Sequence, residues 1–330
     1  MSDAILFVSF GGPDQPSDVM PFLENVTRGR GVPRERLEMV AEHYHHFGGK
    51  SPINDQNLAI VKSLTDLLAR QGPDLPVYFG NRNWQPLLSS TFEQMRGDGV
   101  TRVFAFVTSA FSSYSGCRQY RENIAAAQLE SQPIEVQKLR VYFNHPGFID
   151  PLVDHVRQAK DQLPDARLVF TAHSVPMSMA NTSNYVRQLN EAARLVAEGA
   201  GVAHWDLVYQ SKSGAPGQPW LEPDILDHMR QLHTQGTTGL ILCPIGFISD
   251  HMEVLYDLDE EARLLAGELG IDMIRTPTSS TDPRFIAMIR ELVIERRDGL
   301  STRNALGILG ASHDVCPVDC CPPPPMRPPR

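Results

Sequence analysis

The feature that most constrains the fold is a set of apolar runs without polar alternation. Residues 4–10 read AILFVSF and residues 239–245 read GLILCPI, and each run leads through glycine into a helical pattern. Strands that are apolar on both faces are typical of parallel sheets covered by helices on both sides. Because such strands alternate with helices along the chain, right-handed crossovers are expected. We therefore predict an α/β fold of doubly wound parallel sheets.

Length and local composition predict two such units followed by a tail. A chain of 330 residues suits two doubly wound units of about 150 residues each. The turn FNHPG at residues 143–147 marks the expected joint, so we place an N-terminal domain at 1–147 and a C-terminal domain at 148–310. Residues 311–330 are rich in cysteine and proline, and the prolines favour polyproline II structure or disorder.

Composition limits the partners and the compartment. The net charge of −9 argues against nucleic acid as a partner. The apolar runs are shorter than the roughly 18 residues that a membrane span needs, so no span is expected. The N-terminus enters a strand at once, without a basic region or an arginine-rich amphipathic segment, which predicts a cytoplasmic protein. In that compartment the 5 cysteines are expected to be thiols or metal ligands before disulfides.

The strand at residues 239–245 leads into a segment with a distinctive charge pattern. Residues 246–262 read GFISDHMEVLYDLDEEA, with Ser249 or Asp250 as the expected helix N-cap. On a helix, Glu253, Asp257 and Glu261 have the spacing i, i+4, i+8, so they share one face over roughly 12 Å.

The row formed by Glu253, Asp257 and Glu261, which we call the carboxylate file, has two interpretations. A solvated acidic face is the commoner outcome for a surface helix. The neighbouring His251, and the position just past the carboxyl end of a strand, favour a functional role, because open α/β sheets bind ligands at that edge. Carboxylate and imidazole groups are ligands for divalent metals. The file is therefore suited to pass a divalent metal, or protons, through a cleft.

A second histidine follows another buried strand. His173 lies in TAHSVP at residues 171–176, directly after an apolar run. A lone histidine is usually a packed or surface residue. Here the carboxyl ends of parallel strands meet at one edge, so His173 is expected near the carboxylate file. We therefore predict that His173 acts as an acid–base group or as a metal ligand.

Six segments give the chain a clear resemblance to the ferrochelatases, the enzymes that insert ferrous iron into a porphyrin to make a haem. TAHSVP together with the Glu253 helix is the most specific part, and the resemblance covers about residues 5–262. It implies two Rossmann-like domains facing a central cleft. The segments are SFGGP, HFGGKSPIN, YFGNRNW, TAHSVP, YQSKSGAPGQPWLEPD and GFISDHMEVLYDLDEEA.

The resemblance also implies roles for the residues already singled out. His173 and Glu253 are the catalytic pair at the metal site, and Asp257 and Glu261 continue the metal site outward. Metal insertion must remove two pyrrole protons and strip water from Fe²⁺. An imidazole can bind the metal or accept a proton, while a carboxylate supplies charge and relays protons. Whether His173 delivers iron or takes up protons stays open.

The porphyrin contacts are inferred from the resemblance, with departures. Bacillus-like relatives carry a tyrosine after the first strand, where this chain has Phe10, which has no ligand atom. Tyr114 is the nearest replacement by loop position, and actinobacterial-type relatives resemble this arrangement. An ordinary aromatic residue of the cleft is the alternative for Tyr114.

The propionate groups of the porphyrin need cationic or hydroxyl partners. Arg28, Arg30, Ser51 and Arg82 are the expected partners, since guanidinium groups match carboxylates well. An arginine of similar relatives is replaced here by His43. Cytosolic bacterial relatives of this kind take coproporphyrin III, which has four propionates, and make coprohaem. The chain lacks the apolar lip of mitochondrial relatives, which favours coproporphyrin III over protoporphyrin IX.

Four cysteines form a second candidate site. Cys117 lies in the Tyr114 loop, while Cys316, Cys320 and Cys321 lie together in the tail. Actinobacterial ferrochelatases resemble this arrangement, holding a [2Fe–2S] cluster with one internal and three C-terminal cysteines. The spacing alone would fit zinc about as well. Cys243, on a buried strand, is expected to be a small core residue.

Other functions stay open on the sequence alone. A cobalt or nickel chelatase for a reduced tetrapyrrole would use the same fold and acid–base pair. A haem or iron carrier without catalysis is an alternative from a different class. The expected partners are the porphyrin, ferrous iron and, transiently, neighbouring enzymes of the haem pathway.

Overall fold

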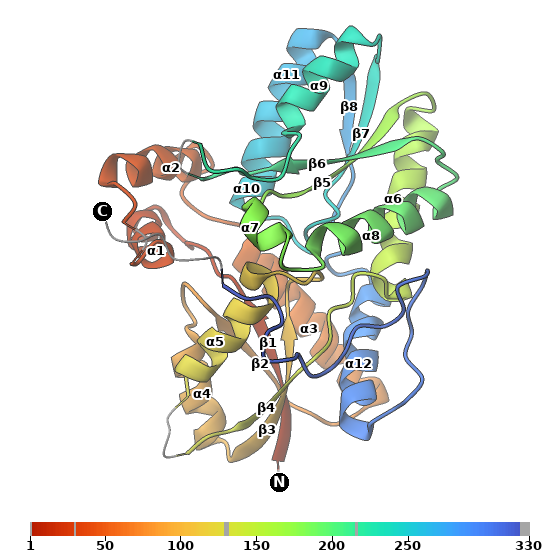
Figure 1. The fold of residues 1–330 in the computed structure, drawn as a ribbon. Coiled ribbons are helices and arrows are strands. Elements are labelled where there is room, and N and C mark those ends of the chain that lie inside the picture. The colour runs from red at the N-terminus through yellow and green to blue at the C-terminus, as the bar shows by residue number, and fades with distance from the viewer. Residues whose placement is uncertain (1, 30, 129–131, 215–216, 324–330) are drawn as a thin grey trace.

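The structure contains two parallel four-stranded sheets with the same strand order (Figure 1). A computed structural model describes residues 2–29, 31–128, 132–214 and 217–323. The first sheet has the order β2-β1-β3-β4 and the second has the order β6-β5-β7-β8. The strands are β1 (Ser2–Ser9), β2 (Val77–Asn81), β3 (Val100–Val107), β4 (Glu135–Lys138), β5 (Arg167–His173), β6 (Trp205–Gln210), β7 (Gly239–Cys243) and β8 (Asp272–Arg275). The predicted fold class is confirmed.

Helices cover both sheets, as the apolar strands require. No helix in the described ranges is long and apolar enough to cross a membrane. The helices are α1 (Val19–Val26), α2 (Arg34–His46), α3 (Ile53–Gln71), α4 (Leu88–Gly97), α5 (Gln119–Ala126), α6 (Pro146–Gln162), α7 (Met177–Ala180), α8 (Tyr185–Gly199), α9 (Ile225–Thr234), α10 (Met252–Val254), α11 (Arg263–Leu269) and α12 (Pro283–Asp298), with a 3₁₀ turn η1 (Pro16–Asp18) and two π-helical segments, η2 (Tyr114–Arg118) and η3 (Leu255–Ala262).

The burial of β1 explains its unbroken apolar sequence. Ile5 and Phe7 point into one hydrophobic cluster, while Leu6 and Val8 point into another on the opposite face. All four side chains are fully buried. A strand covered on both faces has no solvent side for polar residues, so the period-2 alternation is absent.

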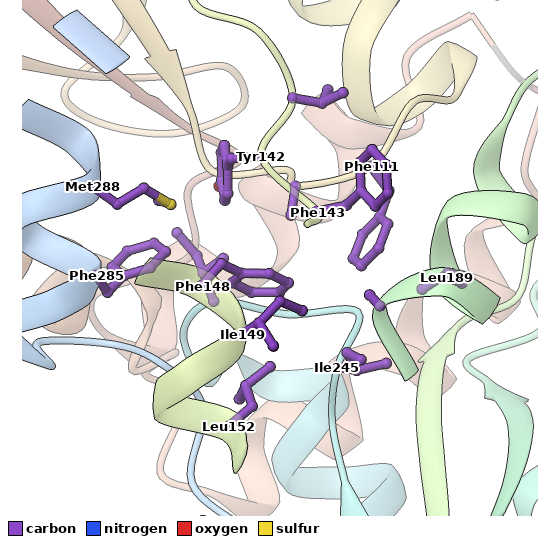
Figure 2. Packing of buried hydrophobic residues seen from close by; sticks show 14 of the residues in the cluster. Phe111, Tyr142, Phe143, Phe148, Ile149, Leu152, Leu189, Ile245, Phe285 and Met288 are labelled. Carbon is purple, nitrogen blue, oxygen red and sulfur yellow. The ribbon is translucent and has the colours of Figure 1, made fainter. Parts of the chain in front are cut away.

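One hydrophobic cluster joins the two sheets. It contains Phe7 of β1 and Phe170 of β5, together with aromatic side chains from α6 and α12. Figure 2 shows Phe148 of α6 beside Phe285 of α12 and Tyr142; the Tyr142 and Phe148 ring centroids are 5.9 Å apart. Burying a side chain of this size stabilises the fold by about 1.5–3 kcal/mol. The two sheets are therefore packed on a shared core.

The last helix crosses between the two halves. α12 follows the second sheet in sequence but packs against α3 and β3 of the first sheet (Figure 1). The predicted boundary between residues 147 and 148 falls in the first turn of α6. The division into domains at 1–147 and 148–310 stays a prediction.

The strand order creates a switch point in each sheet, between the carboxyl ends of β1 and β3 and between those of β5 and β7. β1 and β3 are neighbours at the centre of the first sheet, as are β5 and β7 in the second. Their crossovers leave in opposite directions, and ligands bind at such switch points. The two halves are joined there by buried polar contacts. Ser249, after β7, donates to Asn57 Oδ1 over 3.4 Å, and Asn57 donates to Ser9 Oγ over 2.7 Å.

Candidate active site

The structure brings His173 and Glu253 together. His173 is the last residue of β5 and Glu253 lies in α10, after β7. Because β5 and β7 are neighbours, His173 Nε2 lies 3.3 Å from Glu253 Oε2. The loop between them must pass close to β5: a Cβ at Gly246 would lie 2.8 Å from Ala172 Cα, so only glycine fits. The two side chains are partly buried, with 34% and 48% of their surface exposed.

Two hydrogen bonds fix the orientation of the imidazole and the position of its backbone. His173 Nδ1 donates to the carbonyl oxygen of Ser174 at 2.5 Å. The hydroxyl of Tyr185 donates to the His173 carbonyl at 2.9 Å and holds the strand end in place. With Nδ1 engaged by a backbone acceptor, Nε2 is the nitrogen turned toward Glu253.

Each member of the pair shifts the pKa of the other toward its ionised form. Burial lowers the pKa of His173, but the Glu253 carboxylate and the Ser174 carbonyl outweigh it and raise the pKa to about 9. Burial likewise raises the pKa of Glu253, and the nearby His173 reverses this and lowers it to about 2. Burial lowers the pKa of the neighbouring His251 below its ordinary value. Glu253 therefore offers a negative charge to a cation, and His173 must release a proton before Nε2 can bind a metal.

Asp257 lies next along the helix and is held by two side chains from β6 and the loop after it. The hydroxyl of Ser211 donates to Asp257 Oδ2, and Gln210 Nε2 donates to the same oxygen over 3.2 Å. Gln210 also donates to the Glu253 carbonyl over 3.2 Å. Burial raises the pKa of Asp257 to about 7, against the hydrogen bond from Ser211. Asp257 can therefore gain or lose a proton near neutral pH.

Ser211 adopts an unusual backbone conformation to make this contact. Its φ of 61° lies in the left-handed region, which costs a non-glycine residue of order 1 kcal/mol or more. Gln210 and Ser211 were missed as site residues by the sequence reasoning. Their signal was their place in the YQSKSG segment, where a buried strand ends.

The helix that carries the file differs from the predicted one. Residues 255–262 form a π-helix, a form found frequently at functional sites. The N-cap is His251, whose Nδ1 accepts from the Glu253 amide at 3.2 Å. The expected caps have other partners: Ser249 binds Asn57, and Asp250 pairs with Arg275 at 3.2 Å.

Glu261 lies at the outer end of the same segment. Burial raises its pKa, with a further contribution from Asp224. The carboxylate file thus runs from the ionised Glu253 to two groups that hold protons more tightly. His173, with a pKa of about 9, holds its proton more tightly than Asp257, so that proton moves to Asp257 only when an arriving cation lowers the pKa of His173.

A helix from the first half lies against the π-helix. The His43 ring of α2 stacks on Tyr256, with centroids 3.8 Å apart and planes 7° apart. His46 Nε2 lies 3.5 Å from Glu260 Oε1. Two of the histidines that the sequence places near the end of α2 therefore contact the segment that carries the file.

Two predicted porphyrin contacts, Phe10 and Arg82, lie side by side in the first half. The Phe10 side chain is 37% exposed, and the Arg82 guanidinium lies 5.6 Å from its ring centre. Arg82 also stacks 4.2 Å from the Tyr120 ring and donates to Asn123 at 2.7 Å.

The other predicted contacts vary in placement. The Tyr114 hydroxyl donates to Glu122 Oε2 at 3.0 Å. Ser51 is buried, and its amide donates to the Pro13 carbonyl. Arg28 is exposed, while Arg30 lies outside the described residues.

The structure also brings the four predicted cysteines together. Cys117 and Cys316 share a thiol hydrogen bond, and the sulfur atoms of Cys320 and Cys321 are 3.7 Å apart. The ligand atoms of His313, Cys316 and Cys320 all lie within 4.8 Å of one another. His313 was not singled out from the sequence. Its position three residues before Cys316 was the available signal.

The four clustered cysteines lie near two cationic side chains. The hydrogen bond from Cys316 lowers the pKa of Cys117, against the effect of burial, and Lys138 and Arg121 add to the lowering. Cys243 is buried in β7, in the core rather than at this site.

The raised pKa of Asp257 generates a stability prediction. Between its ordinary value of 3.8 and about 7, the folded chain keeps a proton that the unfolded chain has lost. The carboxyl group therefore costs stability that grows with pH over this range and is constant above it. We expect Asp257→Asn to raise the free energy of unfolding by about 1–3 kcal/mol at pH 8 and to leave it unchanged near pH 4.

Urea denaturation at the two pH values measures this difference. Asp227→Asn, at an exposed position of α9, is the matched control. If Asp257→Asn is no more stable than the wild type at pH 8, the assigned rise in the pKa of Asp257 is contradicted.

Comparison with known proteins identifies the family. The ferrochelatase family profile matches residues 2–297. A protein of Streptomyces coelicolor named coproporphyrin III ferrochelatase is 53% identical, over 97% of this chain and 93% of its own. A ferrochelatase of Rhodopirellula baltica is also 53% identical, over 99% of this chain and 95% of its own.

Solved structures agree on the fold. SirB from Bacillus subtilis with Fe³⁺ has a TM-score of 0.58 at 13% identity, and the match covers 90% of this chain and 98% of SirB. At that identity the likeness concerns the fold alone. With the profile matched over nearly the whole chain and half the residues identical to named members, the protein is an enzyme of the ferrochelatase family.

Proposed function

We propose that the protein inserts Fe²⁺ into coproporphyrin III and so makes coprohaem. The observation that carries the proposal is the His173–Glu253 pair, 3.3 Å apart at the switch point of the second sheet. The choice of porphyrin is supported by relatives at about half identity, such as those of Streptomyces coelicolor and Nocardia farcinica, which are named coproporphyrin III ferrochelatases.

The residues of the second half divide the chemistry between them. Fe²⁺ is a substrate, and the Glu253 carboxylate supplies the charge that attracts it. Insertion displaces two pyrrole protons, which need an acceptor. His173 becomes an acceptor or a ligand once its own proton has left Nε2. Asp257, with a pKa of about 7, takes up that proton and passes it outward toward Glu261.

The residues of the first half hold the macrocycle. Phe10 offers an exposed ring for an apolar contact, and Arg82 stacks between Phe10 and Tyr120. A guanidinium already fixed by aromatic rings loses little entropy when it meets a propionate. Arg28, Arg30 and Ser51 are the further partners that we assign to propionates, and Tyr114 is the aromatic residue of the opposite face.

We also propose that Cys117, Cys316, Cys320 and Cys321 hold a [2Fe–2S] cluster. The group fits these residues, because such clusters take four thiolates and the four thiols gather beside Lys138 and Arg121. When bound, the cluster would supply a one-electron redox centre and a link between η2 and the C-terminal segment. A single zinc ion is the alternative occupant.

Anaerobic metal insertion tests the main proposal. Purified protein is mixed with Fe²⁺ and either coproporphyrin III or protoporphyrin IX, and the Soret and visible bands are followed. We expect rapid conversion of coproporphyrin III, and a fall in kcat/KM of about 10²-fold or more in His173→Ala. His233→Ala, an exposed histidine of α9, is the control and should match the wild type.

Other outcomes of this assay identify the alternatives. Conversion of protoporphyrin IX alone contradicts the porphyrin assignment and leaves the enzyme class standing. Activity with cobalt or nickel on a reduced tetrapyrrole, without activity on Fe²⁺ and porphyrins, points to the other chelatases. Tight binding of added haem without any conversion points to a carrier.

Metal and sulfide analysis tests the cluster. We expect about two iron atoms and two acid-labile sulfides per chain in anaerobically purified protein, with visible absorption of an iron–sulfur centre. Cys117→Ser should lose both, because it removes the ligand on η2. Cys243→Ala, in the core of β7, is the control and should keep them. About one zinc ion per chain without sulfide would contradict the cluster.

A further inference from the structure

We propose that His313 donates a hydrogen bond to the Cys320 sulfur and thereby raises the reduction potential of the cysteine-bound centre. This inference rests on the cluster assigned above. His313 Nε2 lies 3.9 Å from Cys320 Sγ, within reach of a hydrogen bond to sulfur. Cys321 Sγ lies 3.7 Å from the same Cys320 sulfur. The imidazole is therefore a polar group beside the thiols of the tail.

The backbone around His313 is anchored on both sides by one arginine. Arg303 Nη1 donates to the Ser312 carbonyl over 3.4 Å, and Arg303 Nη2 pairs with the Asp314 carboxylate. Arg296 of α12 adds a second cation, 3.7 Å from Asp314. The residues before and after His313 are thus held independently of any metal, so the direction of His313 is set by the protein.

This anchor reaches into the interior. Arg303 Nε lies 3.7 Å from Glu295 Oε1, and Glu295 also forms two hydrogen bonds with Arg140, at 2.7 and 3.0 Å. Arg140 is only 3% exposed. Buried ion pairs with two hydrogen bonds are geometrically well defined. The segment that carries His313 is therefore fastened to the core of the molecule, unlike a free C-terminal tail.

The chemistry of the centre assigns His313 the role of a hydrogen-bond donor. Four thiolates complete the ligand set of a [2Fe–2S] cluster, so the imidazole is left outside it. Reduction adds an electron, and the added negative charge spreads over the sulfur atoms. A hydrogen bond to one of them stabilises the reduced form more than the oxidised form, which raises the reduction potential.

A redox titration of the full-length, anaerobically purified protein tests this inference. The potential is measured from the visible absorption and the electron paramagnetic resonance signal of the wild type, His313→Ala, His313→Gln and the control His233→Ala. We expect a lower potential in His313→Ala with unchanged iron and sulfide content. His313→Gln keeps an N–H donor and should recover part of the shift, while His233→Ala should equal the wild type.

Each contrary result overturns the inference in a distinct way. Equal potentials in the wild type and His313→Ala show that His313 does not tune the centre. Loss of iron and sulfide in both His313 variants shows that the imidazole is a ligand and not a donor. A wild-type protein without a cluster removes the premise. Metal insertion into coproporphyrin III is measured on the same samples, so failure of the main proposal is seen separately.

Discussion

The contact between His173 and Glu253 is the interaction on which the rest of the site depends. It exists because β5 and β7 are adjacent in a parallel sheet and because glycine at 246 lets the following loop pass against Ala172. The strand order thus converts two segments far apart in sequence into one imidazole–carboxylate pair at 3.3 Å. The unbroken apolar strands, the shared core and the crossovers all serve to hold these two strand ends in place.

Two neighbouring carboxyl groups, Glu253 and Asp257, differ in their pKa. The His173 imidazolium lowers the pKa of Glu253 and so keeps it a carboxylate, whereas burial raises the pKa of Asp257 to about 7. In the proposed reaction, an arriving cation meets the negative charge of Glu253, and Asp257 is able to accept a proton that the cation displaces. Ser211 holds Asp257 from a left-handed backbone position, so we assign it as a positioning residue of the proposed relay.

Much of this arrangement could be predicted from the sequence, because it depends on local pattern. The apolar runs determine parallel strands, and residues after such strands meet at one edge, so His173 and Glu253 could be paired in advance. The π-helix and its His251 cap could not, since a spacing of four residues suits either helix type. Ser211 and His313 were missed because their roles arise from contacts in the folded chain, with Asp257 and Cys320 respectively.

The protonation state of His173 is the most direct test of this account. Nuclear magnetic resonance of ¹⁵N-labelled histidine, assigned with His173→Ala, reports whether Nε2 carries a proton. The account predicts an imidazolium signal at pH 7.5 that titrates near pH 9, and a much lower pKa when Glu253 is changed to glutamine. A neutral His173 imidazole at pH 7.5 in the metal-free wild type would contradict the account, because the ion pair would then be absent.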